Sequence, residues 1–168
     1  MLDDVTFMKE ALKEAQEAFQ AGEVPIGAVL VDAAGTVVAR AHNMRETWHD
    51  GTAHAEIIAL QEAAKKLGRW RLSGLTLYVT IEPCPMCAGA LVMSRVDRVV
   101  YGATDAKAGA CESLFNIVRH PVLNHQLEMR AGVLEDECRA IMKRFFRQRR
   151  KKSSALKKCA NQAFDAPE

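Results

Sequence analysis

Residues 75–93, with the sequence LTLYVTIEPCPMCAGALVM, join a strand pattern directly to a helix pattern. The first six residues, Leu75–Thr80, are apolar, aromatic or β-branched and predict a buried strand. Pro85 suits the first turn of a helix, and the residues after it predict a helix over Met86–Met93. A buried strand that leads at once into a helix is typical of α/β proteins.

The segments on either side continue this alternation. Near the N-terminus, apolar residues recur every three to four positions, which predicts an amphipathic helix. The other expected elements are a helix over Asp4–Ala21, a hairpin of strands Ile26–Val31 and Thr36–Ala41, a helix over His54–Leu67 capped by Thr52, a strand over Arg98–Tyr101, a short helix over Glu112–Val118, a strand over Leu127–Arg130 and a helix over Asp136–Arg150. Together they predict an α/β fold in which helices cover both faces of a sheet.

The composition is that of a globular protein with one domain. The chain has 168 residues, 49% hydrophobic and 26% charged, which excludes disordered, collagen-like and disulfide-dense secreted proteins. We expect one domain over residues 1–152 and a flexible tail over 153–168. No apolar run reaches the roughly 18–20 residues of a membrane span, and the acidic N-terminus lacks a secretory signal. A cytoplasmic protein without membrane contact is therefore expected.

Basic residues concentrate near the C-terminus, although the net charge is only +2. Lys143–Lys158 hold nine Lys and Arg and no acid, which leaves 14 basic against 21 acidic residues elsewhere, about −7. Such a cluster is typical of a phosphate-binding surface, but also of a solvated helix that keeps a protein soluble. Phe145 and Phe146 favour nucleic acid, because bases stack on aromatic rings beside cations. One of the two is also expected to anchor the helix in the core.

Two motifs, His54-Ala-Glu56 and Cys84-Pro-Met-Cys87, each open a predicted helix. Cysteines three positions apart at a helix start can reach one ion beyond that end, where the helix favours thiolates. With His54 they are candidate ligands of one zinc ion, and three protein ligands leave room for a catalytic water. Glu56 is the candidate base. Residues two apart face away from each other within a helix, so the ion is expected over the helix N-terminal end.

Other interpretations of these residues stay open. The Cys84–Cys87 spacing also occurs in thiol oxidoreductases, which do not require the His-x-Glu pair. A nucleic-acid-binding module with a structural zinc ion would need a fourth ligand. Cys111 and Cys138 are candidates for it, although both are more typical of small buried residues.

The motifs resemble those of the zinc-dependent nucleobase deaminases, and more closely those of bacterial tRNA-specific adenosine deaminases. The stretches that carry the resemblance are EVPIGAV (23–29), TAHAE (52–56), EPCPMCAGA (82–90) and RVVYGATDAK (98–107). The likeness extends from about Glu23 to Arg150. Guanine and cytosine deaminases share the cysteine motif, so a free-base deaminase is the nearest alternative. The stretch after Tyr101 and the basic C-terminal helix favour tRNA.

The resemblance implies a three-layer αβα sandwich around a five-stranded mixed sheet of the cytidine-deaminase type, and a homodimer. It implies hydrolytic deamination of adenosine to inosine at the wobble position of a tRNA anticodon. In this reaction one zinc ion per chain, held by His54, Cys84 and Cys87, activates a water, and Glu56 shuttles protons. Residues implied to contact the nucleoside or the anticodon loop are Asn43, Asp105, Asn124, His125, Phe145 and Arg149.

Overall fold

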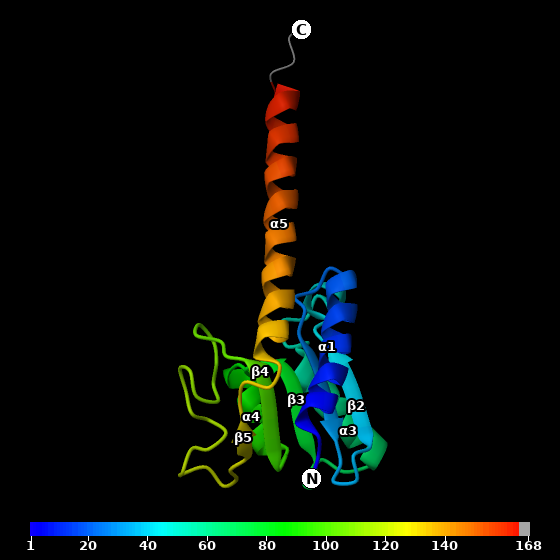
Figure 1. Cartoon of the computed structure of the whole chain (residues 1–168), viewed down its shortest axis with the longest axis vertical. Helices are drawn as coiled ribbons and strands as arrows, with labels where there is room; N and C mark the ends of the chain where they lie inside the picture. Colours follow the sequence, from blue (N-terminus) through cyan, green and yellow to red (C-terminus); the bar gives the residue numbers. More distant parts are fainter. Residues whose placement is uncertain (165–168) are drawn as a thin grey trace.

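A five-stranded mixed sheet forms the centre of the protein (Figure 1). The structure is a computed structural model that describes residues 1–164, with side chains described through residue 160. The strands are β1 (Gly27–Val31), β2 (Val37–His42), β3 (Thr76–Ile81), β4 (Arg98–Ala103) and β5 (Glu128–Arg130). Their spatial order is β2-β1-β3-β4-β5, with β1 antiparallel to both neighbours and β3, β4 and β5 parallel.

Helices cover both faces of this sheet. They are α1 (Asp4–Gln20), α2 (Arg45–Trp48), α3 (Ala55–Leu67), α4 (Pro85–Met93) and α5 (Glu135–Phe164). One hydrophobic core lies between the sheet and α3 and α4, and the other lies between the sheet and α1 with the first turns of α5. The predicted αβα sandwich around a five-stranded mixed sheet is confirmed.

Side chains of the central strands alternate between the two cores. In β3, Leu77 and Val79 belong to the core under α3 and α4, whereas Tyr78 belongs to the core under α1. Val99 and Val100 of β4 alternate in the same way. Because both faces are buried, these strands read in the sequence as continuous apolar runs.

Two local expectations are wrong. The segment expected to be a short helix, Glu112–Val118, consists of turns and irregular backbone, because backbone N–H groups at its start bond to the carboxylate of Glu82. Thr52 does not cap α3, since its hydroxyl donates to Asp50 Oδ1 at 2.7 Å. His54 occupies the cap position instead. The four-residue helix α2 was not expected.

Helix α5 is longer than expected. It was predicted to end at Arg150, but it continues through Phe164 and projects away from the sheet (Figure 1). Residues 153–164 of the expected tail are therefore helical, and residues 165–168 lie outside the described part of the chain. The domain boundary at residue 152 and the flexibility of the tail stay predictions. None of the helices within residues 1–164 is both long and apolar enough to cross a bilayer.

Candidate metal centre and the groove beside it

Two helix starts meet beyond the carboxyl end of β3. His54 and Cys84 are the residues immediately before α3 and α4, and Cys87 lies in the first turn of α4. His54 Nδ1 lies 3.6 Å from Cys84 Sγ and 3.5 Å from Cys87 Sγ. The N-terminal ends of both helices thus point toward this group, where their partial positive charge stabilises thiolates.

The three side chains fit a metal ion. Their ligand atoms lie within 4.8 Å of one another. A tetrahedral ion with bonds of ~2.3 Å to sulfur and ~2.0–2.1 Å to nitrogen separates these ligand atoms by about 3.6 Å, which is close to the two sulfur–nitrogen distances. Among the described residues, no fourth His, Cys, Asp or Glu joins the group. The structure therefore brings together the three ligands predicted from the sequence, and Cys111 and Cys138 are buried elsewhere in the two cores.

Glu56 lies against this group in the first turn of α3 and is only 4% exposed. Burial raises the pKa of its carboxyl, and the neighbouring His54 and Cys87 have smaller effects in the opposite direction. His54 precedes the helix with extended backbone (φ −81°, ψ 150°), so His54 and Glu56 are not two positions apart within one regular helix. This arrangement permits both side chains to face one point beyond the N-terminal end of α3, where the ion was expected from the sequence. A buried carboxyl of raised pKa holds a proton more readily than one in water, which suits a group that accepts and then donates a proton.

The two thiols differ in their affinity for protons. A hydrogen bond from Cys87 is the largest influence on the pKa of Cys84, and together with His54 it lowers that pKa to about 4 against the effect of burial. The same hydrogen bond, with burial, raises the pKa of Cys87. A cation bound between them would favour thiolates at both positions.

Glu82 anchors the segment 105–113 beside the metal ligands. Its carboxylate is 3% exposed and lies two residues before Cys84. It accepts hydrogen bonds from the backbone N–H groups of Asp105 (2.9 Å), Cys111 (3.1 Å), Glu112 (2.9 Å) and Ser113 (3.0 Å), and from the hydroxyl of Ser113. Burial raises its pKa, but these bonds outweigh burial and hold the pKa below its ordinary value.

One feature of the sequence points to this role of Glu82, although the residue was not among those expected in the site. An acidic residue directly after a strand that is expected to be buried needs buried hydrogen-bond donors. Gly109 completes the arrangement, because a Cβ there would overlap Glu82 Oε2. The result is a fixed position for Asp105, whose own carboxylate accepts from the N–H groups of Lys107 and Ala108.

Asn43 follows β2 and is 4% exposed. The backbone N–H of the next residue, Met44, donates to the carbonyl of Ala53 at 3.0 Å, and Ala53 adjoins His54. This bond places Asn43 beside the segment that carries the first metal ligand. Its side chain donates from Nδ2 to Glu23 Oε2 at 3.4 Å, and its buried Oδ1 has no hydrogen-bond partner among the described residues.

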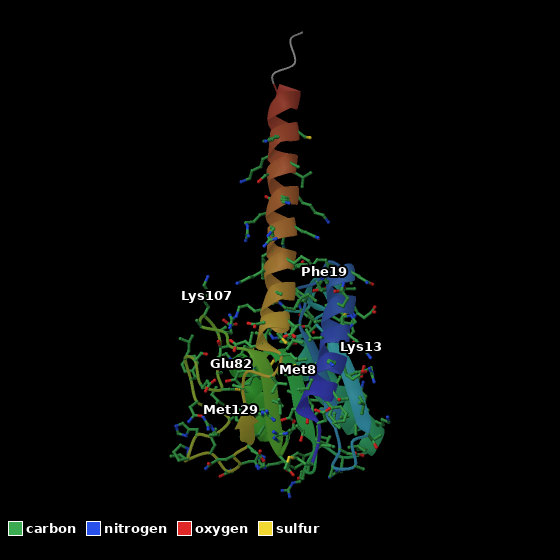
Figure 2. All side chains as sticks on the ribbon, in the orientation of Figure 1. Met8, Lys13, Phe19, Glu82, Lys107 and Met129 are labelled. Atoms are coloured by element: carbon green, nitrogen blue, oxygen red, sulfur yellow. The ribbon has the colours of Figure 1, made fainter. Side chains whose placement is uncertain are left out.

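A basic groove of about 770 Å³ runs between α5 and the loop after β4. Five of its lining residues are basic and one is acidic. The lining residues are Ile81, Ala103, Thr104, Asp105, Lys107, Arg139, Met142, Lys143, Phe146, Arg147 and Arg150. Figure 2 shows Glu82 within the body of the protein and Lys107 on the outlying loop. Ile81, the last residue of β3, lines the groove and lies three residues before Cys84 in the sequence.

The structure corrects the role expected for Phe145. Its ring is 7% exposed and packs edge-on against Phe19 of α1, with the centroids 5.7 Å apart. Phe145 is therefore the core anchor of α5, and Phe146, which is 38% exposed and lines the basic groove, offers the accessible ring. Arg149 lies outside that groove, in a separate hollow beside Phe19.

Asn124 and His125 lie at the other end of the sheet. His125 Nε2 is 2.6 Å from the carbonyl oxygen of Val96, just before β4 begins. The metal ligands follow the carboxyl end of β3, which is parallel to β4, so the length of a strand separates the two places. Asn124 and His125 are therefore distant from the candidate metal ligands of their own chain, and their expected contact with the anticodon loop stays a prediction.

Comparisons with known proteins agree with this geometry. The sequence profile of the MafB19-like deaminase family matches residues 2–150. A tRNA-specific adenosine deaminase of Bacillus subtilis (strain 168) is 55% identical over 158 residues, which cover 94% of this chain and 98% of that protein. One from Haemophilus influenzae is 46% identical over 154 residues, which cover 92% and 89%. The chain belongs to the tRNA-specific adenosine deaminase family.

Solved deaminase structures share the fold of this chain. A structure from work on A-to-I editing by tRNA:A34 deaminases at the wobble position of transfer RNA has a TM-score of 0.78 at 46% identity, covering 81% of this chain and 98% of the other. A guanine deaminase from Bacillus subtilis has a TM-score of 0.59 at 35% identity, covering 76% and 83%. The resemblance seen in the sequence is confirmed, and this free-base deaminase is the more distant of the two.

Proposed function

We propose that this chain is a zinc-dependent enzyme that hydrolyses adenosine to inosine at the wobble position of a tRNA anticodon. The observation that carries the proposal is the buried Glu56 beside the His54, Cys84 and Cys87 group. The chain also has a basic groove, one of whose lining residues, Ile81, ends the strand that leads to Cys84. A hydrolytic deaminase needs an activated water and a proton carrier. A polyanionic substrate also needs a cationic surface.

His54, Cys84 and Cys87 would hold the ion, one per chain. Thiolate and imidazole donors select zinc over magnesium or calcium, which prefer oxygen. When bound, zinc supplies Lewis acidity that activates a water for attack on the adenine ring. The remaining work falls to side chains of this chain.

Glu56 carries protons between water and substrate. Its carboxylate takes a proton from the attacking water and delivers it to ring N1, and it then assists the departure of the 6-amino group as ammonia. The burial that raises the pKa of Glu56 also excludes bulk water from the transfer. One residue can therefore serve as base and then as acid.

The basic groove would hold the RNA. Lys107, Lys143, Arg147 and Arg150 offer cations to phosphates, and the exposed ring of Phe146 offers a stacking surface. A target base must leave its stack to reach the metal, and this requires less free energy in a single-stranded loop than in a duplex. An anticodon loop meets both conditions.

The other predicted residues complete the proposal. Asn43 and Asp105 would contact the target nucleotide, whereas Arg149, Asn124 and His125 would contact RNA farther from the target base. Family membership supports a homodimer that acts in the cytoplasm. Analytical ultracentrifugation of the full chain tests the dimer.

One substrate panel tests the reaction. The purified, zinc-loaded chain is incubated with an anticodon stem-loop bearing adenosine at the wobble position, with free adenosine, with guanine and with cytidine. We expect inosine only in the RNA, because a neutral base or nucleoside cannot use the cations of the groove. Ammonia from guanine alone would instead support a free-base deaminase. A chain without one equivalent of tightly held zinc would support the thiol oxidoreductase.

A further inference from the structure

Glu23 is fully buried, and the catalytic proposal does not use it. It lies just before β1, and its side chain has no exposed surface. Glu23 Oε1 accepts from the backbone N–H of Thr47 at 2.6 Å and from the Thr47 hydroxyl at 2.9 Å. Glu23 Oε2 accepts from Asn43 Nδ2 at 3.4 Å. Both oxygens of the carboxylate are therefore occupied by donors.

This carboxylate decides which end of the Asn43 amide faces it. A carboxylate accepts hydrogen bonds and does not donate them, so the NH₂ group of Asn43 must face Glu23. The carbonyl end, Oδ1, then points away from Glu23. It is buried and has no partner among the described residues. Buried polar atoms are nearly always hydrogen-bonded in native proteins, and an exception calls for an explanation.

The position of Asn43 suggests that a ligand supplies the missing bond. Its neighbour Met44 bonds to Ala53, the residue before the metal ligand His54. An acceptor without a partner at this place suits a donor on the target nucleotide. The ring nitrogens of adenine that carry no hydrogen are acceptors, and Oδ1 would repel them.

We infer that Glu23 is a positioning residue that orients Asn43 so that its Oδ1 accepts a hydrogen bond from the target nucleotide. The inference rests on the proposed function and extends it to the polarity of the contact. Within an RNA chain the target adenosine has two such donors, the ribose 2′-hydroxyl and the 6-amino group. A bond to the 2′-hydroxyl would also let the site distinguish RNA from DNA.

The substitution Glu23→Gln should reverse this polarity. The introduced amide can keep its oxygen toward Thr47 as an acceptor, but it then presents an NH₂ group to Asn43. Two facing NH₂ groups repel each other, so the Asn43 amide turns over and presents its own NH₂ group to the nucleotide. The size of the side chain is unchanged, and the metal ligands are not touched.

The test compares the parent and Glu23→Gln on three stem-loops, whose target adenosine carries a 2′-hydroxyl, a 2′-hydrogen or a 2′-fluorine. In the parent, loss of the 2′-hydroxyl leaves Oδ1 unpaired and should lower kcat/KM by about 5- to 100-fold. In Glu23→Gln the NH₂ group of Asn43 can donate to a 2′-hydroxyl or to a 2′-fluorine, because both are acceptors. The fluorine should therefore be tolerated better than in the parent, and only the 2′-hydrogen should still lower kcat/KM. If Glu23→Gln instead lowers kcat/KM equally on all three stem-loops, its effect is structural and the positioning role of Glu23 is wrong.

Two further variants distinguish the orientation of Asn43 from a general loss of stability. Asn43→Ala should remove the ribose preference by itself, and adding Glu23→Gln to it should have no further effect on that preference. Thr47→Val removes the other side-chain bond to Glu23, so it should lower the Tm while the ribose preference remains. If the parent deaminates the stem-loop and both Glu23→Gln and Asn43→Ala match its kcat/KM on every substrate, the inference is wrong. If the parent deaminates none of them, the proposed function fails first.

Discussion

The role proposed for Glu56 can be tested separately from metal binding. Glu56 lies beside the three ligands but is not one of them. Glu56→Gln should therefore retain about one zinc per chain, whereas turnover of the stem-loop should fall by about 10²–10⁴-fold, the usual contribution of a proton-transfer group. Zinc analysis and single-turnover kinetics measure the two quantities. Glu62→Gln, an exposed position on the same helix, is the matched control, and a Glu56→Gln variant as fast as this control would remove Glu56 from the mechanism.

Glu82 is a second residue whose role can be tested by one substitution, because its carboxylate anchors the segment 105–113. Glu82→Gln keeps the shape but turns an NH₂ group toward backbone donors that now bond to the carboxylate. We expect the free energy of unfolding to fall by about 2–3 kcal/mol, and the amides of residues 111–113 to exchange hydrogen faster. Zinc content should not change, because the ligands lie outside this network. Exchange rates like those of the exposed-site variant Glu137→Gln would contradict the anchoring role.

At the scale of the element, α5 combines a face that packs in the core with a face that is proposed to bind RNA. Phe145 packs on Phe19, whereas Phe146 lines the basic groove. Phe145→Ala should lower the free energy of unfolding by about 3–5 kcal/mol, as for other buried phenylalanines. Phe146→Ala should change stability little and weaken binding of the stem-loop, because a stacked base is worth about 1–3 kcal/mol. Urea unfolding and fluorescence anisotropy distinguish the two effects, and the reverse assignment would show that the helix is turned the other way.

The cations of α5 should appear in the salt dependence of binding. Each neutralised phosphate of a single strand contributes about 0.7 to the slope of log K against log salt. Lys143→Gln with Arg147→Gln should reduce this slope by about 1–2. Lys9→Gln with Lys65→Gln removes two exposed lysines elsewhere on the surface and should leave the slope unchanged. Equal slopes for the two double variants would place the RNA outside the groove.

At the scale of the whole molecule, Asp4 ties the N-terminal helix to three strands. Its carboxylate is 4% exposed. It accepts hydrogen bonds from Tyr78 of β3 (2.8 Å), Arg98 of β4 (2.8 and 2.9 Å) and Arg130 of β5. Burial raises the pKa of Asp4, but these bonds prevail and hold it below its ordinary value of 3.8.

This network predicts a specific pH dependence of stability. Because the folded-state pKa of Asp4 is lowered, the unfolded chain binds the proton more readily, and the stabilisation is fully present above pH 3.8 and lost as the pH falls toward the folded-state value. Asp4→Asn should therefore lower the free energy of unfolding by about 2–3 kcal/mol at pH 7. The difference from the parent should shrink below pH 4. Urea unfolding from pH 7 to pH 3 measures it, and a difference that stays constant, or one shared by the exposed-site variant Asp136→Asn, would contradict this account.

Local sequence patterns were enough to predict most helices and strands and the residues of the candidate metal centre. Continuous apolar runs identify strands buried on both faces, and Pro85 marks the start of α4. The grouping of His54, Cys84 and Cys87 beside Glu56 could be predicted because two short motifs at helix starts occur together in this chain. Short-range spacing contains this information, since each motif spans five residues or fewer.

Only the tertiary structure decided the matters that depend on residues distant in the sequence. Phe145 and Phe146 are neighbours of identical type, and the first is the one that packs against Phe19 of α1 and is buried. The segment expected to be helical after residue 111 bonds to Glu82, about 30 residues earlier. Asn43 presents its carbonyl oxygen because a buried carboxylate 20 residues away takes its amide nitrogen. In each case a long-range hydrogen bond or packing contact outweighs a local preference, because free energy depends on the partners that the fold brings together.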